Sequence, residues 1–304
     1  MSLPDVTILG DPHLGKRFKT GVPLHRVGDR EAAQQKVFRT SLGTVSTPFH
    51  VNMGDLFDQR IVSPEIVLRA AGDYGKVAIL LPDTTFVVLM GNHDVSRNAD
   101  QASSFDLFEA LVSGYRNIVV VKDEPRVLEG YGFVPFSAFR PTTDLVDQLP
   151  DDLTAVFGHW DIQDWGGDNV IPTALLAKKG ITLAVSGHDH LAREETRNGV
   201  KIIVTGSMQP FTHAEDPNGD LYVTTGLPIE GDVTNKNVRV ILKPGETLPA
   251  DLDCLSLTGR RESVEKMEVD TSEFDSLDLG EMLGSALDGL SVKDEIMGAF
   301  ANAD

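Results

Sequence analysis

The sequence FHVNMGDLFD at residues 49–58 joins a short apolar run to a polar motif, Gly54-Asp55-Leu56-Phe57-Asp58. Short apolar runs of this kind are typical of strands that are buried between helices. The glycine lets the backbone turn sharply where the strand ends, without a clash at Cβ. The segment therefore predicts a buried strand that delivers the carboxylate of Asp55 at its carboxyl end.

Four other apolar runs in the chain end in the same way. Their motifs are Gly10-Asp11-Pro12-His13, Gly91-Asn92-His93-Asp94, Gly158-His159 and Gly187-His188-Asp189-His190. Five of the eight histidines lie in these motifs, so the clustering is not a by-product of a histidine-rich composition. Open α/β sheets place their sites in the crevice at the carboxyl ends of the strands. We therefore expect all five motifs to line one crevice.

The wider pattern of the chain predicts an α/β protein with mixed sheets and helices outside them. We expect a helix near Asp29, a second that Ser63-Pro64 opens, and a third over Ser104–Val112. The expected strands are Val6–Leu9, Phe49–Met53, Thr85–Met90, Ile118–Val121, Leu153–Phe157, Ile181–Val185 and Ile202–Thr205.

Composition limits the classes of function. The net charge is −19, and residues 262–304 carry −10 of it, with twelve acidic residues against Lys266 and Lys293. An acidic chain argues against simple nucleic-acid binding, although bound divalent cations would neutralise some carboxylates. The single cysteine, Cys254, fits a reducing compartment. No signal peptide or membrane-length apolar run is evident, so we expect a cytoplasmic protein that does not bind a membrane.

The residue types in the motifs suit a site with two metal ions. A phosphodiester is anionic and repels a nucleophile, so two cations must offset its charge and ionise a water molecule. A carboxylate can bridge two such ions, and Asp55 is our candidate for that role. Imidazole and carboxylate ligands together favour Mn, Fe, Zn or Co over an all-oxygen magnesium site.

The five motifs in this order resemble the calcineurin-like metallophosphoesterase superfamily over about the first 210 residues. Asp11-Pro12-His13, Gly54-Asp55-Leu56-Phe57-Asp58 and Gly91-Asn92-His93-Asp94 are similar to SbcD, the nuclease subunit of bacterial SbcC–SbcD complexes, and Gly206-Ser207 fits the end of that pattern. Residues 14–30 resemble the bacteriophage versions more than the cellular ones. The resemblance implies a four-layer fold, with two mixed β-sheets between helices and a short C-terminal helical extension.

The resemblance also implies roles for individual residues. Asp11, His13, Asp55 and His190 would hold one metal, and Asp55, Asn92, His159 and His188 would hold the other. Mn²⁺ is the expected metal, with Mg, Fe, Zn or Co as alternatives. His93 would donate a proton to the leaving oxygen, with Asp94 or another carboxylate orienting its ring. The implied activity is exonuclease and endonuclease cleavage of duplex DNA ends and hairpins, in DNA recombination, repair or replication.

Further expectations concern substrate and partners. Lys16, Arg17 and His213 are candidate substrate contacts, each with a purely structural alternative. We expect a nuclease domain at residues 1–250 with a reduced or absent cap, followed by an acidic linker and a helical segment at 251–304. In SbcD-like proteins such a segment binds an SbcC-like ATPase of the SMC family, here through residues 270–304. The family further implies a homodimer within a heterotetramer, with Ile66, Leu68, Phe105 and Phe108 as interface candidates.

Two other functions remain open. Another metallophosphoesterase would hydrolyse phosphoproteins or small phosphodiesters, but phosphoprotein phosphatases show Asp-Arg-Gly and GNHE where this chain has Asp58-Gln59-Arg60 and Gly91-Asn92-His93-Asp94. The other alternative is a non-enzymatic scaffold that has lost its metals. Any one motif alone could be an ordinary turn or helix cap. Their joint order at strand ends has no explanation in core packing.

Overall fold

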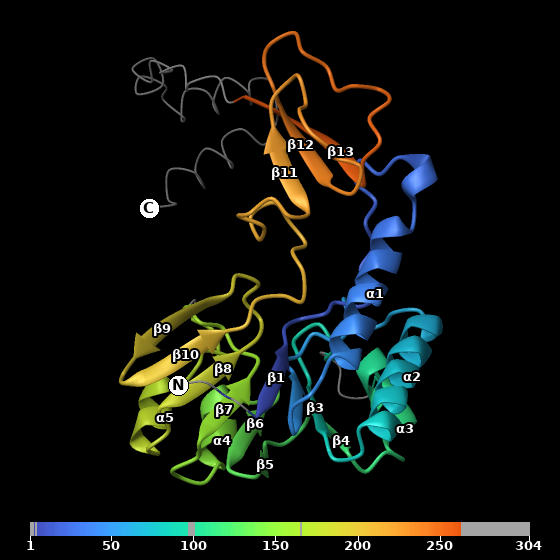
Figure 1. The fold of residues 1–304 in the computed structure, drawn as a ribbon. Coiled ribbons are helices and arrows are strands. Elements are labelled where there is room, and N and C mark those ends of the chain that lie inside the picture. Colours follow the sequence, from blue (N-terminus) through green and yellow to red (C-terminus); the bar gives the residue numbers. More distant parts are fainter. Residues whose placement is uncertain (1–2, 4, 97–100, 165, 263–304) are drawn as a thin grey trace, which may run out of the picture. The chain divides into compact units, whose positions relative to one another are not determined.

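The computed structural model describes residues 3, 5–96, 101–164 and 166–262, and its main body has two β-sheets packed face to face between helices (Figure 1). The first sheet has the order β1-β2-β3-β4. Its strands are β1 (Val6–Leu9), β2 (Phe49–Asn52), β3 (Thr85–Leu89) and β4 (Ile118–Val121). All its neighbouring strands are parallel, so the expectation of two mixed sheets is wrong for this one. The reason is that a helix follows each of the first three strands and returns the chain to the same edge.

The second sheet is mixed, as expected, with the order β5-β6-β7-β8-β10-β9. It comprises β5 (Arg126–Leu128), β6 (Tyr131–Val134), β7 (Ala155–Gly158), β8 (Leu183–Ser186), β9 (Arg193–Arg197) and β10 (Val200–Val204). The central strands are parallel, and a hairpin closes each edge with an antiparallel strand. The parallel centre places the ends of β7 and β8 at one edge of the sheet.

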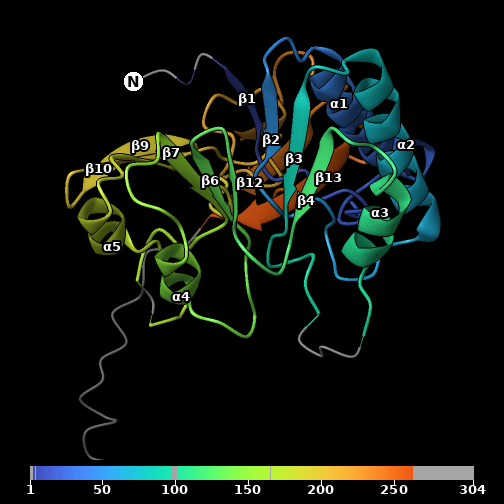
Figure 2. The same ribbon diagram turned by 90° about the horizontal axis from the view of Figure 1, so that it is seen from below.

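Helices cover the outer face of each sheet (Figure 2). Three lie on the first sheet: α1 (Asp29–Gly43), α2 (Pro64–Leu80) and α3 (Ser104–Val112). The second sheet is covered by α4 (Thr142–Asp147) and α5 (Thr173–Lys178). A separate apolar core fills the space between the two sheets, with Val51, Met53 and Val87 on one side and Phe133 and Phe157 on the other. The four-layer fold is thus confirmed.

Local sequence signals explain where the helices begin. Ser63 precedes Pro64 at the first position of α2, as predicted. Ser103 caps α3 in a reciprocal capping box with Asp106. The helix expected near Asp29 is α1, in which Asp29 is the first helical residue and Gly28, with φ of 94°, stands at the cap position. Before α1 the chain forms a short 3₁₀ helix, η1 (Leu24–Arg26).

A third, small sheet follows the two-sheet body. Its strands are β11 (Tyr222–Thr225), β12 (Asn237–Leu242) and β13 (Ser256–Arg261), in that order. Buried Val238, Val240 and Cys254 form its core. Residues 251–261, which we expected to begin an acidic linker, therefore belong to this sheet, because Cys254 and β13 complete its packing. The predicted docking segment at residues 270–304 lies outside the described residues.

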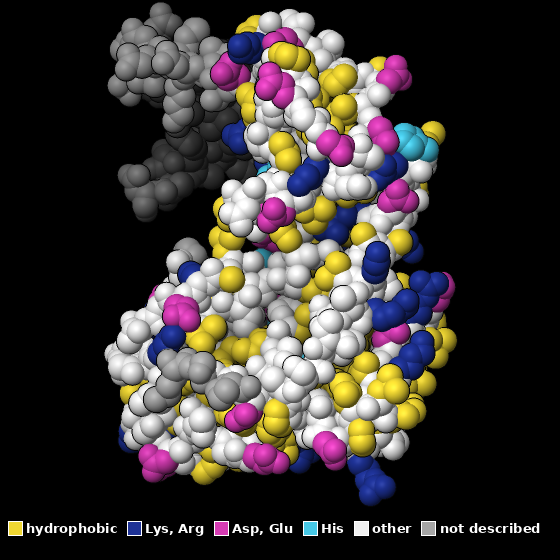
Figure 3. Space-filling view, in the orientation of Figure 1, with side chains coloured by type: hydrophobic (Ala, Val, Ile, Leu, Met, Phe, Trp, Pro, Cys, Tyr) yellow, Lys and Arg dark blue, Asp and Glu magenta, His cyan; other side chains and the backbone are white. Residues whose placement is uncertain are grey.

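Two of the residues expected at a dimer interface are core residues. Phe105 and Phe108 belong to α3 and are fully buried, because their rings pack in the core between the first sheet and its helices. Leu68, by contrast, is 56% exposed, and hydrophobic side chains are visible on the α2 and α3 side in Figure 3. Among the described residues no helix has both the length and the apolar character needed to cross a membrane.

Candidate metal centre

The five motifs meet at the carboxyl ends of five parallel strands. Asp11 and His13 follow β1, Asp55 follows β2, and Asn92 follows β3. His159 follows β7, while His188 and His190 follow β8. The first sheet thus supplies all the oxygen donors and one imidazole, and the second sheet supplies three imidazoles. The two sheets together bring all seven predicted ligands into one crevice.

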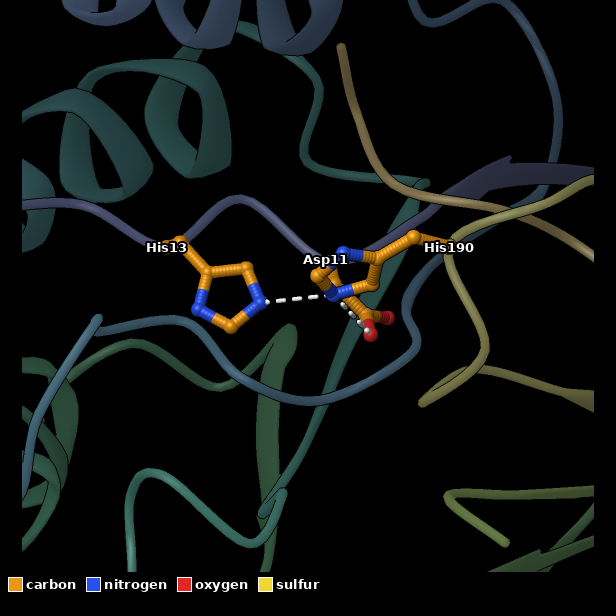
Figure 4. A group of neighbouring side chains, drawn as sticks. All are labelled: Asp11, His13 and His190. Atoms are coloured by element: carbon orange, nitrogen blue, oxygen red, sulfur yellow. Dashed lines mark hydrogen bonds and ion pairs between the residues drawn. The ribbon is translucent and has the colours of Figure 1, made fainter. Parts of the chain in front are cut away.

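One group of donors contains Asp11, His13 and His190, which point toward one another in Figure 4. The Nε2 atoms of His13 and His190 are 3.0 Å apart, and Nε2 of His190 is 3.8 Å from Oδ2 of Asp11. Asp55 adjoins this group, with its Oδ2 atom 3.6 Å from Nε2 of His13. Donor atoms around one metal ion at about 2.0–2.2 Å have separations of this order.

The second group contains Asp55, His159 and His188, with Asn92 between the two histidines. Oδ1 of Asn92 is 2.8 Å from Nε2 of His159 and 2.9 Å from Nδ1 of His188. Oδ2 of Asp55 is 3.5 Å from Nε2 of His159. The same carboxylate oxygen of Asp55 therefore adjoins both groups, which is the position that a bridging ligand needs.

Each of the four histidines turns one ring nitrogen into the centre and the other toward an oxygen. Nδ1 of His159 donates to the carbonyl of Met53 over 2.9 Å. On His188, Nε2 lies 2.8 Å from Oδ1 of Asp161. Nδ1 of His190 is 3.4 Å from Glu215. Histidines that bind metals have this arrangement, since the outer oxygen fixes the tautomer and orients the ring.

His13 completes the pattern with a longer contact. Its Nδ1 atom is 3.5 Å from Oδ1 of Asp58, beyond a close hydrogen bond, while its Nε2 atom faces His190. Asp58 also accepts a hydrogen bond from Lys16, at 3.0 Å. The carboxylate of Asp58 therefore lies between Lys16 and the outer edge of the His13 ring.

The outer carboxylates Asp161 and Glu215 were missed by the sequence interpretation. Both lie in loops beyond the motifs, where an acidic residue is an ordinary loop former. Glu215 also accepts a hydrogen bond from the backbone N–H of Phe211, at 2.8 Å. Burial tends to lower the pKa of His190, but the bond to Glu215 and the charges of nearby carboxylates outweigh it and raise that pKa. Their positions could be found only from the folded structure.

The electrostatics of the centre favour a bound cation. Burial raises the pKa of Asp11 to about 7 and lowers the pKa of His13 to about 3. For Asp55, burial opposes ionisation, but the attraction of His159 outweighs it and holds the pKa below its usual range. Oδ1 of Asp11 has no hydrogen-bond partner among the described residues, although it is buried. A divalent cation would compensate these buried donors, so the residues fit the metal ions that the motifs imply.

Close packing at the junction glycines shapes the centre. Gly54 has φ of 111°, which agrees with the predicted sharp turn. Gly187, in contrast, is needed for space, because a Cβ there would lie 2.6 Å from the carbonyl oxygen of Met53 and 2.7 Å from Oδ1 of Asp11. The backbone is also strained at three donors, His13, Asp55 and His188, whose φ angles are 47°, 47° and 75°. Such strain is typical of functional sites.

His93 lies beside the first group of donors. The centroids of the His13 and His93 rings are 4.7 Å apart. Nδ1 of His93 is 2.5 Å from the carbonyl oxygen of Asp58, which therefore orients the ring. The expectation that Asp94 orients this ring is wrong, because its carboxylate accepts hydrogen bonds from the backbone N–H groups of Leu56, Phe57 and Gly91. Asp94 holds two motif loops together.

The predicted substrate contacts lie around the centre. Nζ of Lys16 is 5.2 Å from the ring centroid of Phe211, and this ring packs against His13 and His190. Arg17 and His213 line a cleft of about 260 Å³ beside Phe211, with Lys19 and Arg239 among the other lining residues. In the described part of the chain no acidic residue lines this cleft, which contrasts with the net charge of the whole sequence.

Comparison with curated protein sequences gives no significant match. Solved structures similar to this chain include the phosphopantetheinyl hydrolase PptH from Mycobacterium tuberculosis, at 13% identity and a TM-score of 0.41, with 67% of this chain and 90% of that one covered. GAP50, the anchor in the inner membrane complex of Plasmodium, is 16% identical with a TM-score of 0.38, covering 67% and 71%. For TT1561 of Thermus thermophilus the identity is 11% and the TM-score 0.44, covering 67% and 89%.

A family model gives the decisive comparison. The model of the calcineurin-like phosphoesterases matches residues 4–192, which is more than half of the chain and includes all five motifs. The match agrees with the four-layer fold and with the His and Asp donor groups at the strand ends. The chain belongs to the calcineurin-like phosphoesterase family of metal-dependent hydrolases.

Proposed function

We propose that this protein is a two-metal phosphodiesterase that cleaves DNA in the manner of SbcD. The observation that carries the proposal is the position of Asp55, whose Oδ2 atom lies 3.6 Å from His13 and 3.5 Å from His159. One carboxylate oxygen between two sets of imidazole donors suits a pair of metal ions and has no evident structural use. Mixed nitrogen and oxygen donors favour Mn, Fe, Zn or Co over magnesium, and the resemblance to SbcD makes Mn²⁺ the expected ion among them.

Seven residues would hold the two ions. The first ion would be bound by Asp11, His13, Asp55 and His190, and the second by Asp55, Asn92, His159 and His188. When bound, the ions offset the charge of a phosphodiester and supply a nucleophilic water. The outer partners Met53, Asp161, Glu215 and Asp58 keep the inward nitrogens of the four histidines available.

His93 would provide the proton for the leaving oxygen. The carbonyl of Asp58 accepts a hydrogen bond from the Nδ1–H group of His93, so the other ring nitrogen is left to act toward the substrate. The His93 ring is edge-on to His13, which puts it beside the first donor group.

The basic cleft supports a polyanionic substrate. Arg17, Lys19, Arg239 and His213 line it, and Phe211 joins it to the metal centre. Arginine and lysine side chains bind nucleic-acid backbones by neutralising phosphates. A strand that occupied this cleft would reach the metal centre with its phosphates compensated, whereas a small uncharged ester would gain nothing there.

The proposed setting follows the resemblance to SbcD. The protein would act in the cytoplasm, in a host cell if it is phage-encoded, with an SbcC-like ATPase that residues 270–304 would dock. Exposed Leu68 and half-buried Ile66 on α2 remain candidates for a homodimer contact. Deletion of residues 270–304 tests the docking: loss of ATPase pull-down with unchanged nuclease activity supports it, and undiminished pull-down rejects it.

Nuclease activity is tested with end-labelled linear duplex DNA and Mn²⁺. Wild-type protein should degrade the label, and His93→Ala should lose most of this activity. His25→Ala is the matched control, since His25 is exposed and its ring contacts Asp253 far from the centre. Metal analysis distinguishes a metal ligand from a proton donor. Asp55→Asn should lower the occupancy of both metal sites, whereas His93→Ala should leave two metal ions bound. Wild type with two bound metals but no cleavage of DNA or of any phosphodiester would contradict the proposal.

A further inference from the structure

A second pocket opens on the other side of the metal centre. Its volume is about 510 Å³, within the range of pockets that hold small ligands. Asn92 and His188 form one part of its lining, so a group in this pocket would adjoin the second donor group. Phe136, Ser137, Phe139, Asp161 and Asp168 are among its other lining residues.

The charge of this pocket is opposite to that of the basic cleft. Asp161 and Asp168 line it, and none of the lysines or arginines that the structure describes does. The carboxylate of Asp161 already pairs with His188, but the carboxylate of Asp168 has no hydrogen bond or ion pair to any described residue. Such a wall repels a phosphate and accepts hydrogen bonds from a neutral group with N–H donors.

An exposed aromatic ring stands at the pocket. Phe139 is 61% exposed, which is unusual for phenylalanine, and Phe136 is half-buried next to it. The loop that carries them is fixed at both ends. The N–H of Phe136 donates to the carbonyl of Met90 over 2.9 Å, and Oγ of Ser137 accepts from the N–H groups of Phe139 and Arg140. The loop backbone is therefore held in place, and an exposed aromatic ring that it presents beside a cavity offers a stacking surface.

We infer that this pocket binds the nucleobase of a nucleotide next to the scissile phosphate. The base stacks on Phe139, and Asp168 accepts a hydrogen bond from an exocyclic amino group. The inference rests on the proposed phosphodiesterase function and adds a base-binding subsite to it. The basic cleft and the base pocket adjoin opposite donor groups, so a strand would lay its backbone on one side and place a base on the other.

Chromogenic esters test the inference without DNA or a partner protein. The substrates are the p-nitrophenyl esters of deoxynucleoside 3′- and 5′-phosphates, with methyl p-nitrophenyl phosphate as the ester that lacks a base. The measured quantity is the ratio of kcat/KM for each nucleoside ester to kcat/KM for the methyl ester, in Mn²⁺. Stacking on one aromatic ring predicts a ratio of about 5 to 100 for the better-oriented isomer in wild type.

Substitutions of the pocket residues then show whether Phe139 and Asp168 cause the preference for nucleoside esters. Phe139→Ala should bring the ratio close to one, and Phe139→Trp should keep it, because the flat ring is retained. Leu191→Ala is the matched control: Leu191 is another exposed apolar residue near the centre but does not line this pocket. Asp168→Asn should reduce the preference for deoxycytidine over thymidine esters by several-fold.

The outcomes separate the subsite from the function on which it rests. A wild-type protein that binds two metals but hydrolyses none of the esters refutes the phosphodiesterase proposal itself. Hydrolysis with a wild-type ratio near one, or a ratio that Phe139→Ala leaves unchanged, overturns the base pocket alone. Equal losses in Phe139→Ala and Phe139→Trp also overturn it, since stacking would then not be the determinant.

Discussion

His50 is the buried side chain whose replacement should stabilise the protein. It lies in β2, is fully buried, and packs against Phe86 and Tyr74, with ring centroids 5.6 and 6.4 Å away. Neither ring nitrogen has a hydrogen-bond partner among the described residues. We predict that His50→Leu raises the free energy of unfolding, because leucine fills a similar volume without unpaired polar atoms.

The size of the effect follows from two terms. At pH 7, removal of an unsatisfied buried polar group should stabilise by about 1–2 kcal/mol. Burial also lowers the pKa of His50 from 6.5 to about 4. In the unfolded chain His50 is protonated below about pH 6.5, whereas in the folded chain it stays neutral down to about pH 4. The free energy of unfolding of the wild type therefore decreases as the pH falls through this window. From pH 7 to pH 5 this loss is about 2 kcal/mol, and His50→Leu should avoid it.

Denaturant unfolding at pH 7 and pH 5 measures both terms, with EDTA present so that metal loading does not change with pH. The advantage of His50→Leu over wild type should be larger at pH 5 by about 2 kcal/mol. Phe86→Leu is the control, because it alters the same packing without an imidazole and should cost a similar amount at both values. A His50→Leu protein less stable than wild type, with a parallel pH dependence, would show that the ring is satisfied, for example by buried water.

Three further predictions concern the metal centre. Gly187→Ala should abolish binding of at least one metal and lower activity by more than about 100-fold, since its Cβ would overlap Asp11 and the Met53 carbonyl. Metal analysis checks this, and Gly114→Ala, at an open position without a positive φ, controls for the loss of a glycine. Glu215→Ala should weaken binding of one ion by about 10- to 100-fold in Mn²⁺ titrations, because His190 loses its orienting partner; an unchanged affinity would exclude that role. Saturating Mn²⁺ at about 100 times its dissociation constant should add about 2.7 kcal/mol per site, and so raise the melting temperature of the EDTA-treated protein by roughly 10 °C if both sites load. A melting temperature that Mn²⁺ leaves unchanged would argue against the site.

The main strands and the motif residues could be predicted because both signals are local. The run Val6–Leu9 and the helix Ser104–Val112 have the predicted bounds, since buried β-branched runs and a capping serine mark their own ends. The order of the motifs then predicted one crevice. The all-parallel character of the first sheet was not foreseen, because the pairing of strands depends on crossover connections rather than on the composition of a strand.

The outer partners of the histidines could not be predicted from spacing. Asp161 lies two residues after His159 but contacts His188 from the neighbouring strand, and Glu215 reaches back to His190 from a loop 25 positions later. An acidic residue in a loop has many ordinary explanations, so the sequence gives it no distinguishing signal. The hydrogen bond from His159 to the Met53 carbonyl likewise cannot be predicted from the sequence, because every residue has a backbone carbonyl.

That last bond explains why the packing of the two sheets matters to the chemistry. Met53 directly follows β2 of the first sheet, and His159 follows β7 of the second. Both segments also contribute to the core between the sheets, where Met53 packs in the same cluster as Phe157. The distance between the sheets therefore determines where the inward nitrogen of His159 points. It also determines how far that nitrogen lies from Asp55. A shift of one sheet against the other would move three imidazoles relative to the carboxylates, so the motifs form a metal centre only when this core is correctly packed.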